Sequence, residues 1–413
     1  MNKAAYTSGE QAHIFDISGS ENIIIERVNA NDSGGDGFYV GNFEATLFFS
    51  KDVVLRQCVA NNNRRQGLSV ISVDGFLAEG CKFTNTKGTA PKSGVDIEPN
   101  NNSGQDLLKR VRFVDCVAEG NDGRGFLVSL HRMTASNERV DITFDRCRTK
   151  GNSFGSSVNY GAEGTKAVKG EVAFIDCAAD QEQYAGYSVL SSSPESVKTS
   201  FIRCRAVNCN TVNAPNDPYG YGSSFIVTTV PQFPRTAIGN VEFLECTSID
   251  ERITPLIIRG FSVKKNHAEV IRDVRFVNCK TIGGTQRLLY IEPTADRVFA
   301  DLRPQPELTM SSTASVDTGA NGHLIVNSGA LGAVTLTLPQ AKKGQTFAFA
   351  VESPNLLKLT AQAGSMIRTP SGIKAELESA NLGDSITLTG RADGNWDLNG
   401  YVGTWFGTSL AGQ

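Results

Sequence analysis

Apolar residues alternate in a six-residue segment that the chain repeats and that always ends on cysteine. The segment reads VRFVDC at 111–116. Related copies stand at 53–58, 76–81, 142–147, 172–177, 199–204, 241–246 and 274–279. The copies end 23 to 42 residues apart, and six of the eight carry Phe three residues before the cysteine. A repeat of this period predicts a solenoid of stacked, similar coils.

Each repeat contains three short segments with a period of two, which is the period of a β-strand. In the copy at 111–116, Val111 and Phe113 point inward, followed by Cys116 and Ala118, and FLVS at 126–129 forms the third segment. The turns between them are rich in Asn, Asp and Gly. The pattern predicts an all-β fold that begins as a right-handed parallel β-helix of about nine coils. Its third strands are expected at 37–41, 67–71, 94–98, 125–129, 157–161, 186–190, 225–229, 255–259 and 288–292.

The pattern changes after RPQPEL at 303–308, where the cysteines stop. Short alternating segments such as AVTLTLP at 333–339 and TFAFAVE at 346–352 follow at close intervals. Strands at this spacing are typical of an antiparallel β-sandwich. We therefore predict two domains, a β-helix over 1–305 and a C-terminal β-sandwich over 306–413 that serves trimerisation or carbohydrate binding.

The cysteine pattern favours buried thiols over disulfides. One cysteine per coil predicts an internal column in which each thiol acts as a small apolar group. The ninth cysteine, Cys209, falls outside this register and is expected to be a loop thiol. No CxxC pair or Cys/His cluster has the spacing of a zinc site, so we expect no metal and no cofactor.

Composition narrows the possible partners. The net charge of −3 gives no electrostatic argument for nucleic acid, and no stretch of about 18 apolar residues predicts a membrane span. Residues 1–30 lack the pattern of a signal peptide. Residues 1–22 are too short and too polar to cover the open end of a sheet, so we expect a capping or attachment domain to be missing from the N-terminal side.

The strongest candidate chemistry lies in the third coil, in TNTKGTAPKSGVDIEPNNN at 84–102. Asp96 and Glu98 are expected on the outer face of one strand, with Cα atoms about 6.5–7 Å apart. Such a pair can divide acid and base roles in glycosidic cleavage, and each charge raises the pKa of the other. The competing interpretation is structural, because Glu98-Pro99 recurs as Glu292-Pro293 in the ninth coil, and Pro can simply end a strand.

Basic and aromatic residues in the flanking turns are candidates for substrate binding. Arg65 and Arg124 are expected beside the carboxylate pair. His131 with Arg132 could serve as a base and an anion clamp for a uronic acid, or form an ordinary solvated loop. Tyr39 is a candidate platform for a sugar ring.

Residues 61–100, NNNRRQGLSVISVDGFLAEGCKFTNTKGTAPKSGVDIEPN, resemble the pectin-lyase-like β-helices of bacteriophage tailspikes and related polysaccharide-degrading proteins. The order of a β-helix and a small β-sandwich also resembles tailspikes over the whole chain. The resemblance implies a homotrimer on the virion tail, assembled in the host cytoplasm and attached through an N-terminal region that this chain lacks. It also implies recognition, and usually cleavage, of a host surface polysaccharide. Only Asp96 and Glu98 fall on the matching motif.

Three functions remain open from the sequence. The first is a polysaccharide depolymerase, where the carboxylate pair favours a hydrolase and His131 with Arg132 favours a lyase. The second is a receptor-binding spike that grips the glycan without cleaving it. The third is a secreted bacterial enzyme of the pectate-lyase type, against which the absent signal peptide and free cysteines count.

Overall fold

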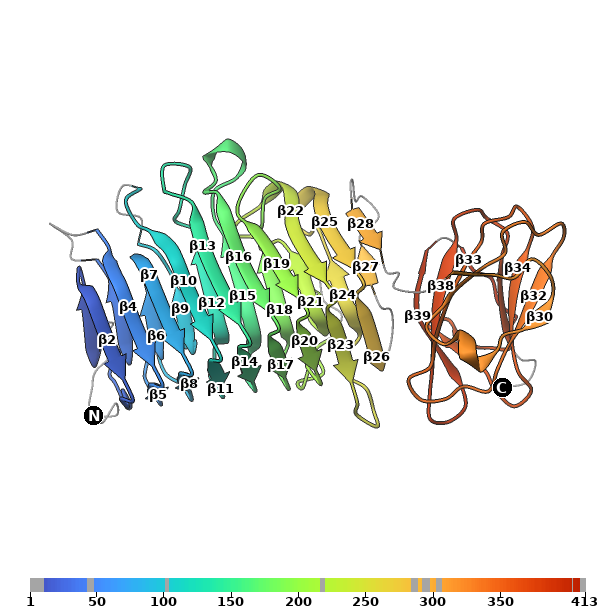
Figure 1. Cartoon of the computed structure of the whole chain (residues 1–413), viewed down its shortest axis with the longest axis horizontal. Helices are drawn as coiled ribbons and strands as arrows, with labels where there is room; N and C mark the ends of the chain where they lie inside the picture. The colour runs from blue at the N-terminus through green and yellow to red at the C-terminus, as the bar shows by residue number, and fades with distance from the viewer. Residues whose placement is uncertain are drawn as a thin grey trace. The chain divides into compact units, whose positions relative to one another are not determined.

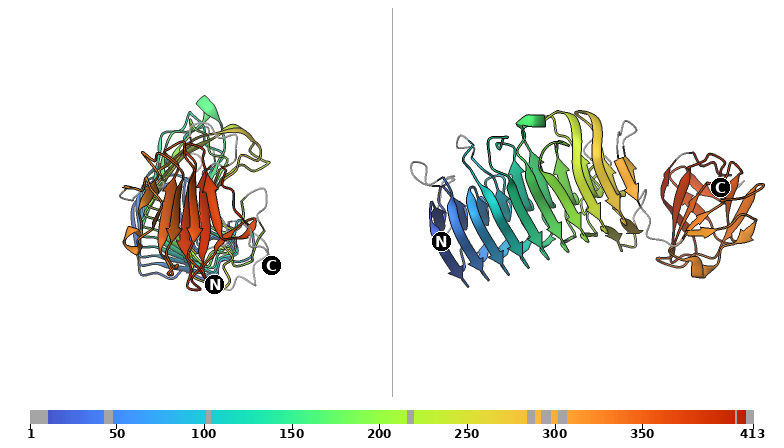
Figure 2. Two further views of the ribbon diagram at one scale, coloured as in Figure 1. Left: turned by 90° about the vertical axis from the view of Figure 1, so that its right-hand side faces the viewer. Right: turned by 45° about the horizontal axis from the view of Figure 1, so that its top comes forward.

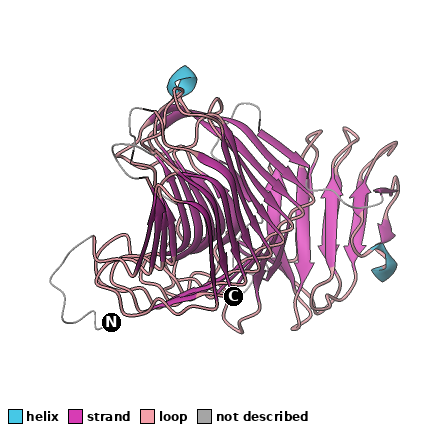
Figure 3. Ribbon diagram, turned by 60° about the vertical axis from the view of Figure 1, so that its left-hand side comes forward, coloured by secondary structure: helices cyan, strands magenta, loops and turns pink. Residues whose placement is uncertain are grey.

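The computed structural model describes residues 11–42, 48–100, 104–215, 220–283, 289–291, 298–301, 307–402 and 404–408. The chain forms two compact units, one of residues 1–280 and 290–301 and one of residues 281–289 and 302–413. The expected boundary between residues 305 and 306 lies outside the described residues, as does the Glu292-Pro293 pair. Strands and loops make up almost all of the structure, with the short helical turns η2 (Gly164–Lys166) and η3 (Thr318–Ala320) (Figure 3).

The first unit is a parallel β-helix, as the repeat predicts (Figures 1 and 2). Sheet A contains β1 (Phe15–Ser18), β3 (Phe38–Gly41), β6 (Leu68–Val70), β9 (Val95–Ile97), β12 (Arg124–Leu130), β15 (Phe154–Tyr160), β18 (Ala185–Leu190), β21 (Ser223–Thr228), β24 (Arg259–Val263) and β27 (Leu289–Ile291). Sheet B contains β2 (Glu21–Glu26), β4 (Ser50–Arg56), β7 (Val73–Glu79), β10 (Leu108–Val114), β13 (Val140–Asp145), β16 (Gly170–Ile175), β19 (Lys198–Ile202), β22 (Arg235–Leu244), β25 (Ala268–Val277) and β28 (Val298–Asp301). Sheet C contains β5 (Val59–Asn61), β8 (Lys82–Thr84), β11 (Val117–Glu119), β14 (Arg148–Lys150), β17 (Ala178–Asp180), β20 (Arg205–Val207), β23 (Thr247–Asp250) and β26 (Lys280–Gly283).

Each coil runs through sheets B, C and A in that order, and we number the coils from one, which contains β2 and β3, to nine, which contains β25 to β27. Strand β1 adds a rung to sheet A before coil one, and β28 adds a rung to sheet B after coil nine. The expected number of about nine coils is therefore confirmed, with a partial turn at each end.

Aromatic rings fill the interior in columns. The six repeat phenylalanines stack with centroid distances between neighbours of 4.7 to 5.1 Å, in the order Phe113, Phe144, Phe174, Phe201, Phe243 and Phe276. Rings from sheet A meet this column edge-on, as Phe225 does against Phe243. All six phenylalanines are at most 1% exposed. Stacked and edge-on pairs are the favoured geometries for aromatic rings, so one residue type at one repeat position builds a continuous core.

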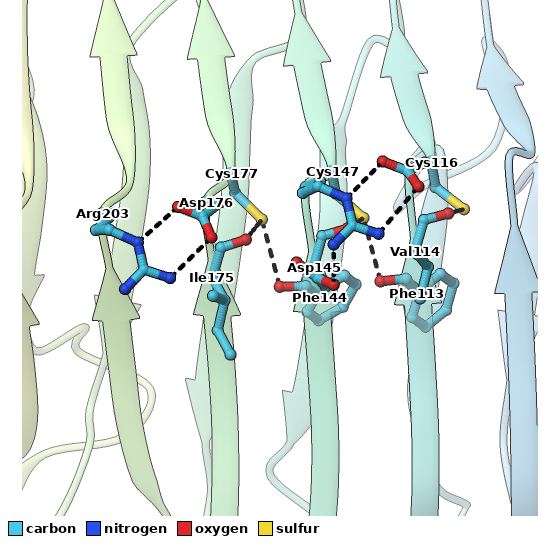
Figure 4. Close-up of polar contacts among 12 residues, drawn as sticks. Phe113, Val114, Cys116, Phe144, Asp145, Cys147, Ile175, Asp176, Cys177 and Arg203 are labelled. Carbon is cyan, nitrogen blue, oxygen red and sulfur yellow. Dashed lines mark hydrogen bonds and ion pairs between the residues drawn. The ribbon is translucent and has the colours of Figure 1, made fainter.

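The repeat cysteines form a second column, and all nine thiols of the chain are free and buried. Each repeat thiol donates to a backbone carbonyl of the preceding coil. Figure 4 shows this for Cys147, whose Sγ lies 3.5 Å from the Phe113 oxygen, and for Cys177, at 3.4 Å from the Phe144 oxygen. The predicted internal column of thiols is confirmed.

The ninth cysteine, Cys209, lies in a turn outside the register of the repeat, as expected, and it is buried there. It is 0% exposed and follows β20 in coil seven. The equivalent turn position of other coils holds Asn63, Asn121 and Asn152, whose Nδ2 atoms donate to the carbonyls of Ala30, Phe83 and Ala118. Cys209 Sγ faces the corresponding Ala179 carbonyl at 4.0 Å. The thiol therefore takes the place of an asparagine in a ladder between coils.

The third strand of coil eight is also misplaced in the sequence analysis. Residues 255–258 form no strand, and the sheet A strand is β24, in which Phe261 pairs with Phe225 and Val263 with Val227. The segment Gly260-Phe261-Ser262-Val263 repeats the small-aromatic-polar-Val pattern of residues 37–40, and this signal was available in the sequence. Residues 251–258 instead form an excursion between sheets C and A.

The C-terminal unit is a two-sheet structure with mixed strand pairing, so its predicted antiparallel character is only partly correct. One sheet contains β29 (Glu307–Thr309), β31 (Leu324–Val326), β33 (Thr346–Ala350), β38 (Ser385–Gly390), β39 (Trp396–Val402), β35 (Ile367–Thr369) and β36 (Gly372–Lys374). The other contains β30 (Ala314–Ser315), β32 (Val334–Leu338), β34 (Leu357–Ala361) and β37 (Glu376–Ser379).

Successive strands from β29 to β34 alternate between the two sheets, which makes the pairs β29–β31, β31–β33, β30–β32 and β32–β34 parallel. The later strands return antiparallel, as in β33–β38 and β34–β37. Between the sheets lies a separate apolar core that includes Phe347, Phe349 and Trp396.

Candidate functional site

The candidate site lies on the outer face of sheet A in the first coils. Strand register aligns Tyr39 with Ser69, and Ser69 with Asp96. A second row is formed by the residue before the glycine that precedes each strand, and it contains Asp36, Gln66, Ser93 and Arg124. Because parallel strands lie about 4.8 Å apart, side chains from coils one to four are neighbours here.

The predicted carboxylate pair is present, but its two members differ in exposure. The Glu98 side chain is 24% exposed, whereas Asp96 is only 1% exposed. Asp96 Oδ2 accepts from Gln66 Nε2 at 2.9 Å, and Gln66 Oε1 accepts from the Ser93 amide at 2.8 Å. The expectation that both carboxylates face solvent is wrong for Asp96, because side chains from neighbouring coils cover it.

The surroundings of Asp96 favour its protonated form. Burial raises the pKa of Asp96 well above its usual value, and the charge of Glu98 and a hydrogen bond to its carboxyl raise it further. Asp96 Oδ1 is buried and has no donor among the described residues. Protonation of the Asp96 carboxyl at this atom would remove its need for a donor, which agrees with the raised pKa.

Arg65 connects the pair to a third carboxylate. Its Nη2 atom lies 3.8 Å from Glu98 Oε2, and its Nη1 atom donates to Asp36 Oδ2 at 3.4 Å. The Arg65 side chain is 17% exposed. The guanidinium therefore lies between Asp36 of coil one and Glu98 of coil three. Arg65 thus lies beside the carboxylate pair, as the sequence predicted.

Asp36 is a site residue that the sequence analysis missed. It is fully buried, and burial raises its pKa to about 7 even though Arg65 and Ser69 oppose the shift. Ser69 Oγ donates to Asp36 Oδ2 at 2.8 Å. His13 Nδ1 lies 3.3 Å from the Asp36 amide nitrogen and 3.3 Å from Asp36 Oδ2. Burial lowers the pKa of His13, which agrees with a neutral ring.

The other predicted binding residues lie at different distances from this cluster. The Tyr39 ring stacks on His13 with centroids 4.7 Å apart, and burial raises its pKa to about 12. One face of that ring is therefore occupied by the protein. Arg124 lies 5.4 Å over the Phe154 ring, and the charge of Asp96 acts on it, while burial lowers its pKa.

His131 is a neighbour of the pair, and Arg132 is not held there. His131 Nδ1 is hydrogen bonded to Ser129 Oγ at 2.8 Å, and its ring lies 5.7 Å from that of Phe233. Burial lowers the pKa of His131, and the charge of Glu98 opposes this shift. Arg132 is exposed in the turn that follows β12. The structure therefore brings Asp96, Glu98 and Arg65 together, with His131 within electrostatic range.

This arrangement can give and take back one proton beside a fixed positive charge. Glu98 is the accessible carboxyl, Asp96 is its buried partner, and Arg65 can bind an anionic or hydroxyl-rich ligand. No group of three potential metal ligands is found among the described residues, and none of their helices is long and apolar enough to cross a membrane.

Comparisons with known proteins connect the chain to a prophage. No protein-family model matches it, and the search of solved structures found no match. It is 28% identical over 162 residues to the SPbeta prophage-derived uncharacterized protein YorA of Bacillus subtilis (strain 168), a match that covers 37% of this chain and 26% of YorA. It is 32% identical over 89 residues to the uncharacterized protein YclG of the same strain, covering 20% of this chain and 15% of YclG. A relative of this chain is thus encoded by a prophage.

Proposed function

We propose that this β-helix is part of a phage tailspike that binds and hydrolyses a surface polysaccharide of its host bacterium. The adjacent carboxyls of buried Asp96, whose pKa is raised, and accessible Glu98 carry the proposal. A carboxyl that keeps its proton beside an accessible second carboxyl can protonate a glycosidic oxygen, which is the demanding step of glycoside hydrolysis. The resemblance to tailspikes and the prophage-encoded relative support a place on the virion tail.

In this proposal Glu98 contacts the glycan and Asp96 acts through it. The pair gives its proton to the glycosidic oxygen, and the bond between that oxygen and the anomeric carbon breaks. Water adds to the anomeric carbon, and its released proton returns to the pair. Arg65 holds the sugar beside Glu98 and keeps this carboxyl oriented at 3.8 Å. A lyase reaction would instead use neutral His131 as base, with Arg132 on the sugar carboxylate.

The test is cleavage of purified capsular or O-antigen polysaccharide by the whole protein. Oligosaccharide products are expected, and Glu98→Gln is expected to reduce the rate about 10²- to 10⁴-fold, as for loss of a general acid. Glu79→Gln serves as a matched control, because the Glu79 side chain is 47% exposed on sheet B, where it pairs with Arg56. Products with unsaturated ends, detected by ultraviolet absorbance, would assign a lyase. Full activity of both Asp96→Asn and Glu98→Gln would refute the site.

A receptor-binding spike without catalysis is the second candidate. It is favoured by the burial of Asp96, which is 1% exposed and hydrogen bonded to Gln66, so that only Glu98 is open to a glycan. Glycosidases typically use two carboxyls on either side of the glycosidic bond. In this case the wild-type protein would bind the polysaccharide, and the glycan would keep its length.

We also propose a homotrimer, as in the tailspikes that the chain resembles. Sedimentation equilibrium is expected to give three times the chain mass of 44.3 kDa. A stable monomer at micromolar concentration would contradict the trimer and leave the catalytic test unaffected.

A further inference from the structure

A hollow lies at the turns that follow the strands of sheet C, away from the candidate site. It has a volume of about 360 Å³ and extends from coil four to coil eight. Its lining residues are Glu119, Lys150, Gln181, Asn208, Thr211 and Arg252, together with Gly120 and Gly151. Volumes from about 300 Å³ upward are usual for sites that bind small molecules.

Two glycines create this hollow. The residues after the sheet C strands of coils two to seven, and Asp32 at the equivalent place in coil one, have a positive φ, and we call this series the outer turn column. Its members are Asp32, Asn62, Asn85, Gly120, Gly151, Gln181 and Asn208, with φ between 50° and 68°. Asn and Asp tolerate this conformation well, so five of the seven coils carry a side chain there.

The backbone conformation therefore does not require glycine in coils four and five. Because Gly120 and Gly151 have no side chains, the space that a side chain would fill there is empty. A Cβ atom placed on Gly151 would meet no atom within 4 Å. At Gly120 it would lie 2.8 Å from Asn85 Oδ1, so this position is closed on the side of coil three. The floor of the hollow is thus formed by Gly120 and Gly151, the two positions of the outer turn column that carry no side chain.

A fixed guanidinium stands at the far end of the hollow. Arg252 Nε and Nη2 donate to the two oxygens of Asp250 at 2.8 and 2.9 Å, and Nη2 also donates to the Cys209 carbonyl at 2.7 Å. The Asp250 side chain is 1% exposed, and it also accepts the amides of Leu256 and Ile257. Arg252 Nη1 has no hydrogen-bond partner among the described residues. This donor group is therefore held in place before any ligand arrives.

The lining offers donors and acceptors of both charges, with apolar side chains beside them. Glu119 and Lys150 lie opposite each other on the neighbouring strands β11 and β14, and Gln181 adds an amide. Next to Thr211 and Arg252, Val212 is 49% exposed and Ile253 is fully exposed. The hydroxyl groups of a sugar ring can form hydrogen bonds with such donors and acceptors. The C–H face of the ring can pack against the aliphatic side chains.

We propose that this hollow binds one pyranose unit of a glycan, at a site distinct from the Asp96–Glu98 pair. The inference rests on the proposed function only in taking a glycan as the ligand. The Arg252 guanidinium and the Gln181 amide hold ring hydroxyls, and Lys150 and Glu119 hold the opposite edge. In this proposal the hollow is an anchoring site, because Glu119 is the one carboxylate among its lining residues.

Saturation-transfer NMR on the whole protein tests this site with four free sugars, namely glucose, galactose, N-acetylglucosamine and glucuronate. At least one is expected to bind at millimolar concentration. Gly151→Asn fills the hollow with a side chain that the same column carries in coils two, three and seven. It is expected to weaken binding about tenfold or more, which is about 1.4 kcal/mol. Lys150→Ala gives a second measurement that leaves the turn backbone unchanged.

Two controls make the result specific. Gly329→Asn makes the same change at a glycine with φ of 72° and open space around its Cβ, in the C-terminal unit, and is expected to leave binding unchanged. Glu98→Gln is expected to stop polysaccharide cleavage and to retain sugar binding at the hollow. The inference is overturned if none of the sugars binds, or if Glu98→Gln abolishes binding while Gly151→Asn and Lys150→Ala retain it. Neither result bears on cleavage at the pair, which is assayed separately.

Discussion

At the scale of single residues, the site depends on carboxyl groups that the solenoid covers. The repeat register could place Asp96 and Glu98 on one face of sheet A, because the period of two fixes which side each residue takes. It could not show that Gln66 bonds to Asp96, since this contact joins side chains of different coils. Asp36 was missed, although alignment of the residues before each strand glycine would have put it in one row with Gln66 and Arg124.

Buried carboxyls give the stability of this protein a definite pH dependence, and Glu182 is the clearest case. It is fully buried, with Asn152 donating its amide at 2.6 Å, and burial raises its pKa from 4.5 to about 8. Between these values the unfolded chain releases the proton and the folded chain keeps it. The free energy of unfolding therefore falls as pH rises through this window, by up to about 5 kcal/mol from this group.

Glu182→Gln is expected to remove this contribution, because the amide resembles the protonated carboxyl. Urea denaturation at pH 5, 7 and 9 would show a shallower loss of stability than in the wild type, and higher stability at pH 9. Glu138→Gln is a matched control, since the Glu138 side chain is 61% exposed. An unchanged pH slope in Glu182→Gln would contradict the raised pKa.

At the scale of elements, the periodic pattern predicted the strands well where it was strict. The columns of Phe and Cys gave the coils and their inward positions, because a one-residue shift would turn every apolar side chain outward. The pattern failed at β24, where an insertion before the strand supplied other apolar residues. It also could not predict that the C-terminal strands first alternate between two sheets, because alternation within a strand does not specify which strand is its partner.

At the turn before each repeat cysteine, the coils form ion pairs that the periodic pattern of apolar residues does not predict. Asp115, Arg146, Asp176 and Arg203 occupy successive coils there with φ near 50°. Arg203 binds both oxygens of Asp176, at 2.7 and 2.8 Å (Figure 4). Arg146 likewise binds both oxygens of Asp115. Charges thus alternate in sign along the stack, and their pairing becomes visible only when the coils are superposed.

Removing one ring from the phenylalanine column is expected to be costly. Phe144 lies between Phe113 and Phe174 at 4.8 and 4.7 Å and is fully buried. Phe144→Ala should lower the free energy of unfolding by about 3–5 kcal/mol, measured by urea denaturation followed by circular dichroism. Phe406→Ala, at a side chain that is 64% exposed, should have little effect. Equal losses in the two variants would argue against the column.

The cysteine column predicts that the folded protein is insensitive to thiol reagents and reductants. All nine cysteines are free and buried, so Ellman's reagent should titrate none in the native protein and all nine in denaturant. The thermal midpoint should be the same with and without dithiothreitol. A midpoint that falls on reduction would reveal a disulfide and contradict the structure.

At the scale of the whole molecule, the two units have separate cores and should lose structure separately. Both tryptophans of the chain, Trp396 and Trp405, belong to the C-terminal unit. Trp396 is fully buried, with its indole N–H donating to the Pro339 carbonyl at 3.0 Å. Tryptophan fluorescence therefore reports only on this unit, while circular dichroism reports mostly on the larger solenoid.

Denaturation followed by the two signals is expected to give transitions that do not coincide, which is the usual sign of more than one cooperative unit. Phe144→Ala should shift the transition seen by circular dichroism and leave the fluorescence transition in place. If fluorescence shifts equally in that variant, the two units unfold as one.

The confinement of the candidate site to coils one to four has a consequence for how this molecule can change in evolution. In a solenoid each coil contacts only its neighbours, so coils five to nine can be duplicated or deleted without disturbing Arg65, Asp96 or Glu98. Each duplication would carry the last coil about 4.8 Å further from the catalytic candidates. The length of the solenoid and the candidate site can therefore change independently in evolution: a lineage could lengthen its solenoid to cross a thicker polysaccharide layer while Asp96 and Glu98 stayed the same.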